Sequence, residues 1–269
     1  MLKALNDYVQ ERYGDVLGLF DGWHRTMMPL EQVSKRFEAA LDMLALSDVE
    51  WRNWKVVLTD NSGLMVNPNR REIEIGGSLL ALPTARIKGL FAHEVLTHAQ
   101  RSVNGGRYSE QLAVGLDGCV SAEEGLGILM ETAVNGAVPH RIRDRYIDTA
   151  LALGGYGGRA VTRPELYNLA YARARARRLI AGEDVDPELL RKITWTHVNR
   201  IYRGTLGNDF IGVFTKDISY YKGFYAMANY VLHRTDWGAS IAEVLEYLMS
   251  GKFDPTDPYH AREIKGHLS

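Results

Sequence analysis

The segment from residue 84 to residue 103 constrains the fold more than any other part of the chain. Its apolar residues follow a helical pattern but lie on every side of the helix, which predicts a helix buried in the protein interior. The same segment carries His93, Glu94 and His98. Unpaired polar groups are costly inside a protein, so two imidazoles and a carboxylate on a buried helix need partners. A metal ion is one such partner.

The spacing of the two histidines differs by one residue from the His-Glu-x-x-His pattern of zinc peptidases, in which the histidines bind zinc. Five residues advance a regular α-helix by about 500°, so the imidazoles of His93 and His98 would lie about 140° apart. A π-bulge would bring both rings to one face, and so would an early helix end after which His98 turns back. We favour the bulge, because the helical pattern continues through Arg101. The alternative is two unrelated buried histidines bonded to backbone.

A third ligand is expected from residues 121–131, which predict a second helix. Zinc hydrolases use three protein ligands and keep one position open. Either Glu123 or Glu124 can reach the metal from this helix, and their spacing from His98 does not choose between them. The other interpretation of Glu124 is structural, as the third residue of a capping box with Ser121 as N-cap.

Composition limits the kind of metal site and the kind of partner. The chain has 269 residues, a net charge of −1 and one cysteine, Cys119, which excludes an internal disulfide and any site built from several thiolates. The balanced charge gives no reason to expect nucleic acid or a membrane as partner. No apolar run approaches the roughly 18 residues of a membrane span. Because Asp7, Glu11 and Asp15 interrupt the N-terminal apolar residues, we expect no signal peptide and a cytoplasmic protein.

The hydrophobic patterns predict one mostly helical α+β domain over residues 1–269. It would consist of a helical part (1–50), a small β region (51–78) and a helical part with the metal site (79–269). We expect a small antiparallel sheet of strands 54–59, 64–67 and 72–75, with a hairpin around Asn67-Pro68-Asn69. Glycines are expected to end the sheet and to separate the later helices, at Gly76-Gly77, Gly105-Gly106, 154–158, Gly182, 204–207 and Gly238.

These motifs resemble those of the microtubule-associated tyrosine carboxypeptidase family between about residue 60 and residue 235. The resembling segments are His93-Glu94-x-x-x-His98, Asn104-Gly105, Glu124-Gly125-Leu126, Arg200-Ile201-Tyr202-Arg203-Gly204, Phe214-Thr215-Lys216-Asp217 and Tyr220-Tyr221-Lys222-Gly223. The three-residue gap between Glu94 and His98 is itself a feature of that family. Its Gln-Glu-Gly-Leu-Ala motif has Glu123 and Gly127 at its first and last positions here.

The resemblance implies a zincin-like, gluzincin-type metallopeptidase with one Zn²⁺ per chain, bound by His93, His98 and Glu124. It implies that Glu94 is the catalytic base and that the enzyme removes a C-terminal residue from a peptide or protein. In such a reaction a metal makes water nucleophilic and the glutamate carries the proton to the leaving amine.

The remaining roles are assigned by residue type. A tyrosine-rich helix carries Tyr220, Tyr221, Tyr225 and His233 as candidate oxyanion donors, and we choose Tyr220 as the catalytic residue and Tyr221 as a substrate contact. For the substrate carboxylate we choose Arg203 and Lys216, because a guanidinium or ammonium group recognises such an anion.

Two other functions and one other feature complete the sequence-based hypotheses. The same zinc site would also serve an endopeptidase or aminopeptidase, and a non-catalytic helical binding protein could keep a structural zinc or none. The arginines at 173, 175, 177 and 178 and at 141, 143 and 145 predict solvated helix faces, with some arginines paired to carboxylates rather than bound to nucleic acid.

Overall fold

A computed structural model describes residues 1–21, 27–60, 63–76, 82–155, 157–182, 186–205 and 212–268. It divides the chain into two compact units, Met1–Pro139 with Lys222–Ser269, and His140–Tyr221. Gly77, residue 156 and residues 206–207, where the sequence predicts glycine-rich breaks, lie outside the described residues. Within the described part, no helix combines the length and hydropathy that a bilayer crossing requires. That the whole chain is one domain stays a prediction.

The first unit is mostly helical, as predicted. Its helices before the unit boundary are α1 (Leu2–Gly18), α2 (Leu30–Ser47), the 3₁₀ helix η1 (Val49–Asn53), α3 (Thr84–His93), the π-helix η2 (Glu94–Ala99), α4 (Gln100–Gly106), α5 (Glu110–Val114) and α6 (Val120–Asn135). Helices α10 (Ile218–Asp236), α11 (Ile241–Leu248) and α12 (Pro258–Leu268) follow, and α10 begins in the second unit.

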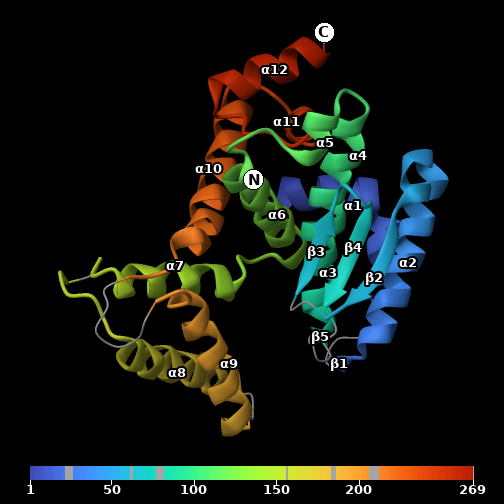
Figure 1. Ribbon diagram of the computed structural model, residues 1–269. Helices are drawn as coiled ribbons and strands as arrows, with labels where there is room; N and C mark the ends of the chain where they lie inside the picture. The colour runs from blue at the N-terminus through green and yellow to red at the C-terminus, as the bar shows by residue number, and fades with distance from the viewer. Residues whose placement is uncertain are drawn as a thin grey trace. The chain divides into compact units, whose positions relative to one another are not determined.

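The sheet of the first unit confirms the three predicted strands but corrects their arrangement. Strands β2 (Lys55–Thr59), β3 (Leu64–Asn67) and β4 (Glu72–Gly76) pair in the order β2-β4-β3, so the hairpin β3–β4 is antiparallel while β2 and β4 are parallel (Figure 1). The chain reverses after β2 and again after β3, so β2 and β4 run the same way. Strand β4 carries the buried Ile73 and Ile75 and takes the central position. The expected antiparallel sheet is therefore a mixed one.

A second, short pairing was not predicted. Strand β1 (Met27–Met28) pairs antiparallel with β5 (Leu82–Pro83), which directly precedes α3.

One hydrophobic core joins the sheet to the helices of the first unit and fixes the helix that carries the histidines. Phe91 on α3 packs against Phe20 and Phe37, with ring centroids 4.8 and 5.1 Å apart. Helix α3 also packs along α6, so the segments around His93 and Glu124 belong to neighbouring helices.

The second unit consists of α7 (His140–Ala152), α8 (Arg163–Ile180), α9 (Pro187–Ile201) and the 3₁₀ helix η3 (Thr215–Asp217). Helices α8 and α9 lie side by side (Figure 1). Proline and an acidic residue in the first turn start both helices, and Thr162 and Glu165 form a capping box at α8. The second unit has a small hydrophobic core of its own, which includes Leu166, Ala170 and Val198.

Candidate metal centre

A π-helical segment follows His93 and contains His98, as the sequence predicts. Segment η2 runs from Glu94 to Ala99 between α3 and α4, so the helix continues without ending at His98. The hydroxyl of the fully buried Thr97 donates to the carbonyl of Ala92 at 2.9 Å, five residues back. The rings of His93 and His98 come to the same side, with centroids 4.8 Å apart and planes at 79°.

Three ligand atoms converge from the last residue of α3, from η2 and from α6. His93, His98 and Glu124 each offer one donor atom, and these atoms lie within 4.8 Å of one another. The Glu124 Oε2 atom lies 3.4 Å from His93 Nε2 and 3.7 Å from His98 Nε2. A tetrahedral ion with bonds of about 2.1 Å needs donors about 3.4 Å apart. The separations from Glu124 therefore fit zinc, and the donor set is one that zinc uses in hydrolases.

The other nitrogen of each imidazole faces a second carboxylate. His98 Nδ1 lies 2.8 Å from Glu123 Oε1, within hydrogen-bond distance. His93 Nδ1 lies 3.5 Å from Glu131 Oε2, and no hydrogen bond forms there. A carboxylate at Nδ1 fixes the tautomer that presents Nε2 to a metal and makes Nε2 more basic. The two adjacent glutamates therefore contact different sides of the imidazoles. Glu124 lies beside the Nε2 atoms, and Glu123 bonds to Nδ1 of His98.

Glu123 is in turn held by two buried cations. The guanidinium of Arg101 bonds to Glu123 Oε2, and Lys252 Nζ lies 3.5 Å from Oε1. Arg101, whose side chain is 1% exposed, also donates to the carbonyls of Gly251 and Phe253 at 2.7 and 2.9 Å. Every group in this network has a partner, which is the condition under which buried charges are tolerated.

One face of α6 is shaped to accept the His93 ring. Glu124, Gly127 and Glu131 are three and seven residues apart and therefore share a helix face. A Cβ atom at Gly127 would lie 2.8 Å from His93 Nε2, closer than van der Waals contact allows. Glycine at this position gives the ring its place between the two carboxylates.

Two further glycines, Gly125 and Gly223, allow the start of α6 to pack closely against α10. A Cβ at Gly223 would lie 1.8 Å from the carbonyl oxygen of Ser121, and one at Gly125 would lie 2.1 Å from the carbonyl carbon of Gly223. The two backbones therefore touch one residue away from Glu124. The helix begins at Val120 with Cys119 as N-cap, so the predicted N-cap at Ser121 and its capping box are wrong.

Negative charge around the imidazoles shifts the pKa values of the cluster. Burial disfavours the charged ring of His98, but the hydrogen bond with Glu123 and the nearby Glu124 carboxylate outweigh it and raise its pKa to about 10. The nearby carboxylates of Glu124 and Glu131 likewise raise the pKa of His93 against burial. Burial likewise opposes the Glu124 carboxylate, yet the two imidazoles hold its pKa well below the usual range. A cation would take the place of these protons, which fits a metal.

Glu94 lies at the edge of this cluster. Its side chain is half-buried at the start of η2, and its charge contributes to the raised pKa values of both His93 and His98. A carboxylate whose charge acts on both imidazoles lies close enough to them to serve as the general base for a water molecule at the cluster. Its catalytic role stays a prediction.

Tyr225 and His233, two of the candidate oxyanion donors, lie on α10 within the first unit, whereas the four chosen substrate residues belong to the second unit. The Arg203 guanidinium stacks over the Phe214 ring, 3.6 Å from its centroid, and Lys216 is exposed in η3. Tyr220 hydrogen-bonds Arg200, and Tyr221 stacks on Tyr146 with centroids 4.5 Å apart. Their roles toward a substrate stay predictions.

Sequence reasoning missed the residues that support the ligands. Glu131 had a local signal, because it lies two helical turns after Glu124 on the same face. Arg101 and Lys252 had none, since they are 151 residues apart and meet Glu123 only through the tertiary fold.

Comparison with known families matches most of the chain to one family model. The family model described as microtubule-associated tyrosine carboxypeptidase matches residues 23–149 and 185–264, which is most of the chain and includes every residue of the cluster. A comparison with the curated proteins found no match.

Proposed function

The chain belongs to the microtubule-associated tyrosine carboxypeptidase family, and on that basis we propose that it is a zinc-dependent carboxypeptidase. One observation supports this proposal above the others. His93, His98 and Glu124 offer donor atoms within 4.8 Å of one another, and Glu124 Oε2 lies 3.4 and 3.7 Å from the two Nε2 atoms, close to the separation that a tetrahedral ion requires. The substrate is a peptide or protein with a free C-terminus, and tyrosine, which the family description names, is the first residue to test.

In the proposed reaction His93, His98 and Glu124 hold the zinc ion. When bound, such an ion would act as a Lewis acid that makes water nucleophilic near neutral pH and polarises the scissile carbonyl. Glu94 accepts the proton of the attacking water at its carboxylate and passes it to the leaving amine. The hydrogen bond between Glu123 and His98 Nδ1 would keep that imidazole oriented with Nε2 toward the ion, and the Glu131 carboxylate faces Nδ1 of His93 at 3.5 Å.

Residues of the second unit complete the proposal for the substrate. Arg203 and Lys216 would bind the terminal carboxylate, Tyr221 would contact the substrate, and Tyr220 would donate to the oxyanion. Their chemistry supports these roles, because cations recognise carboxylates and a phenol donates to a developing negative charge.

Metal content tests the site. Elemental mass spectrometry of the purified protein should find about one zinc per chain, and His98→Ala should lose it. A wild-type protein without metal, even after zinc is added back, would contradict the proposal and favour a helical binding protein.

Dependence on the substrate terminus tests the reaction class. A peptide with a free C-terminal tyrosine should be shortened by one residue, whereas its C-terminal amide should stay intact. Glu94→Gln should keep its zinc and lose hydrolysis, because the base is removed and the ligands remain. Cleavage of the amidated peptide would instead indicate an endopeptidase or aminopeptidase.

A further inference from the structure

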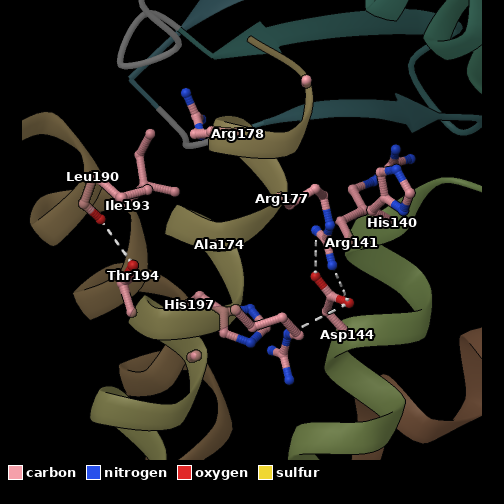
Figure 2. Close-up of a pocket in the computed structure, with 13 residues that line it drawn as sticks. His140, Arg141, Asp144, Ala174, Arg177, Arg178, Leu190, Ile193, Thr194 and His197 are labelled. Atoms are coloured by element: carbon pink, nitrogen blue, oxygen red, sulfur yellow. Dashed lines mark hydrogen bonds and ion pairs between the residues drawn. The ribbon is translucent and has the colours of Figure 1, made fainter. Parts of the chain in front are cut away.

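The second unit contains a cavity of about 430 Å³ between α7, α8 and α9. Figure 2 shows Arg141 and Asp144 from α7, Arg177 from α8, and Ile193 and His197 from α9 around it. The volume lies in the range of small-molecule pockets. None of the residues proposed for the carboxypeptidase reaction lines this cavity.

Positive charge dominates the cavity. Arg141, Arg173, Arg177 and Arg178 line it, and Asp144 is the one carboxylate among the described lining residues. The buried Asp148 lies behind Arg173. Four arginines, Asp144 and Asp148 together give the cavity a formal charge of +2 when its histidines are neutral. The unit as a whole has 14 Lys and Arg residues against 9 Asp and Glu, although the complete chain is nearly neutral. A cavity with this surplus attracts anions.

Two of the guanidinium groups are fixed in position before any ligand arrives. Both terminal nitrogens of Arg177 donate hydrogen bonds to the Asp144 carboxylate, at 2.8 and 3.0 Å (Figure 2). Arg173 binds Asp148 in the same bidentate way, and His197 lies 2.7 Å from that carboxylate. Each guanidinium has five N–H groups, and such a pair uses two of them. The remaining donors are therefore preorganised, which reduces the entropy cost of binding an anion.

The rest of the wall is apolar. Ala170 and Leu190 are buried, Ala174 is half-buried, and the side chain of Ile193 is about half exposed. A ligand that fits this cavity combines an anionic group with an organic body. Helix α8, which carries Arg173, Ala174 and Arg177, lies between the two ranges matched by the family model.

We propose that this cavity binds a small phosphomonoester, whose phosphate meets Arg173 and Arg177 and whose organic part contacts Ala174 and Ile193. A phosphomonoester carries a charge between about −1.5 and −2 at pH 7, which matches the surplus of the cavity better than a single carboxylate does. The guanidinium edge also matches phosphate geometry.

Isothermal titration of the full chain with phenyl phosphate tests the proposal, at constant ionic strength. Inorganic phosphate and a hexaglutamate peptide serve as comparison ligands. Phenyl phosphate should bind more tightly than inorganic phosphate, because its ring adds contact with the apolar wall. Hexaglutamate should bind more weakly than phenyl phosphate, because the cavity is too small for a peptide chain.

Two substitutions on one helix separate the cavity from general charge. Ala174→Asp places a carboxylate in the cavity without removing any existing bond, and should weaken phenyl phosphate binding by about tenfold or more. Ala176→Asp adds the same charge on an exposed position of α8 outside the lining and should leave binding nearly unchanged. Arg177→Ala and the exposed Arg175→Ala form a second matched pair.

Four results would overturn the proposal. They are undetectable binding of phenyl phosphate, equal weakening by Ala174→Asp and Ala176→Asp, equal affinity for phenyl phosphate and inorganic phosphate, and tighter binding of hexaglutamate. The last would identify an acidic-peptide site. Because Arg177→Ala leaves Asp144 without its main partner and can unfold the unit, the Ala174→Asp pair decides the outcome.

Discussion

At the scale of single residues, the carboxylate of Glu123 is shared by three side chains. Its Oε1 atom accepts from His98 Nδ1 at 2.8 Å with Lys252 Nζ at 3.5 Å, and its Oε2 atom binds Arg101. Burial opposes this charge, but Arg101, Lys252 and His98 together lower the pKa of Glu123 to about 2. The residue therefore stays an anion that can hold His98 in one tautomer and one orientation.

We predict that Glu123→Gln weakens zinc binding by roughly tenfold to a hundredfold while the protein stays folded. The amide oxygen can still accept from His98, but the charge that makes the imidazole more basic is lost. Titration against a chelator of known zinc affinity measures the change. Exchange of the exposed Glu110 for Gln, on the same unit, should leave the affinity unaltered. Equal affinity of Glu123→Gln and wild type would show that Glu123 does not position His98.

The two histidine donors were predictable from the chain because their chemistry is local. Imidazoles on a buried helix need a partner, and the extra residue between them favoured a π-bulge over an early helix end. The cations behind Glu123 were not predictable, since the segment around Gly251 reaches Arg101 only in the folded protein. Glu124 was assigned as ligand by family resemblance, whereas spacing alone left Glu123 as an equal alternative.

At the scale of elements, the helices and their ends followed the sequence more closely than the sheet did. Periodic apolar residues and glycines are local signals, so a helical part over residues 1–50, where α1 and α2 lie, and the long helix that contains η2 were expected. The pairing of β2 with β4 depends on which strand is buried on both sides, and that is a property of the tertiary structure.

We predict that Gly223→Ala lowers the free energy of unfolding by about 2 kcal/mol or more, because α10 and α6 must separate to admit the methyl group. Zinc affinity should fall with it, since Ser121 and Gly125 flank the turn that carries Glu124. Denaturant unfolding and zinc titration measure the two effects. Gly18→Ala is the matched control, because a Cβ there meets no atom within 4 Å and alanine favours the helix. Equal stability of Gly223→Ala and wild type would contradict the close backbone contact between α6 and α10 at Gly125 and Gly223.

We also predict a pH-dependent loss of stability for Asp148→Asn, which breaks the buried link between α7, α8 and α9. Burial opposes the Asp148 charge, but bonds from His197 and Arg173 lower its pKa below the ordinary value. A lowered pKa means that the stabilisation is complete above the unfolded pKa of about 4 and disappears as the pH falls through the folded pKa. At pH 7 the variant should lose roughly 3 kcal/mol.

The difference between wild type and Asp148→Asn should then shrink below about pH 4, as the wild-type carboxylate becomes protonated. Urea unfolding at several pH values measures it. The exposed Glu188→Gln on α9 should cost much less, because its partner Arg191 is 3.9 Å away and solvated. A difference that stays constant down to pH 2 would exclude Asp148 as the titrating group.

At the scale of the whole molecule, the nearly neutral total charge conceals two units of opposite sign. Residues 140–221 carry 14 basic and 9 acidic side chains, and the rest of the chain carries 18 and 24. The arginines expected on solvated helix faces account for much of this surplus, and Arg173 and Arg177 are paired to aspartates as expected. The net charge alone could not reveal this separation.

We predict that removing the metal destabilises the first unit. A ligand present at a thousand times its dissociation constant stabilises the folded state by about 4 kcal/mol, so a chelator should lower the corresponding unfolding transition by roughly 10 °C. Added zinc should restore it. Differential scanning calorimetry of wild type beside His98→Ala checks this, because the variant should respond to neither reagent. A wild-type transition that ignores both would argue against a metal in this unit.

The bonds of Arg101 also set the order of events during synthesis. The carbonyls that hold its guanidinium belong to Gly251 and Phe253, and the ammonium group beside Glu123 belongs to Lys252. All the metal ligands leave the ribosome more than a hundred residues before these partners do. A nascent chain therefore displays His93, His98 and Glu124 long before Glu123 can be neutralised in the folded core. If the chain binds zinc as proposed, stable loading of the metal follows the synthesis and folding of these C-terminal partners.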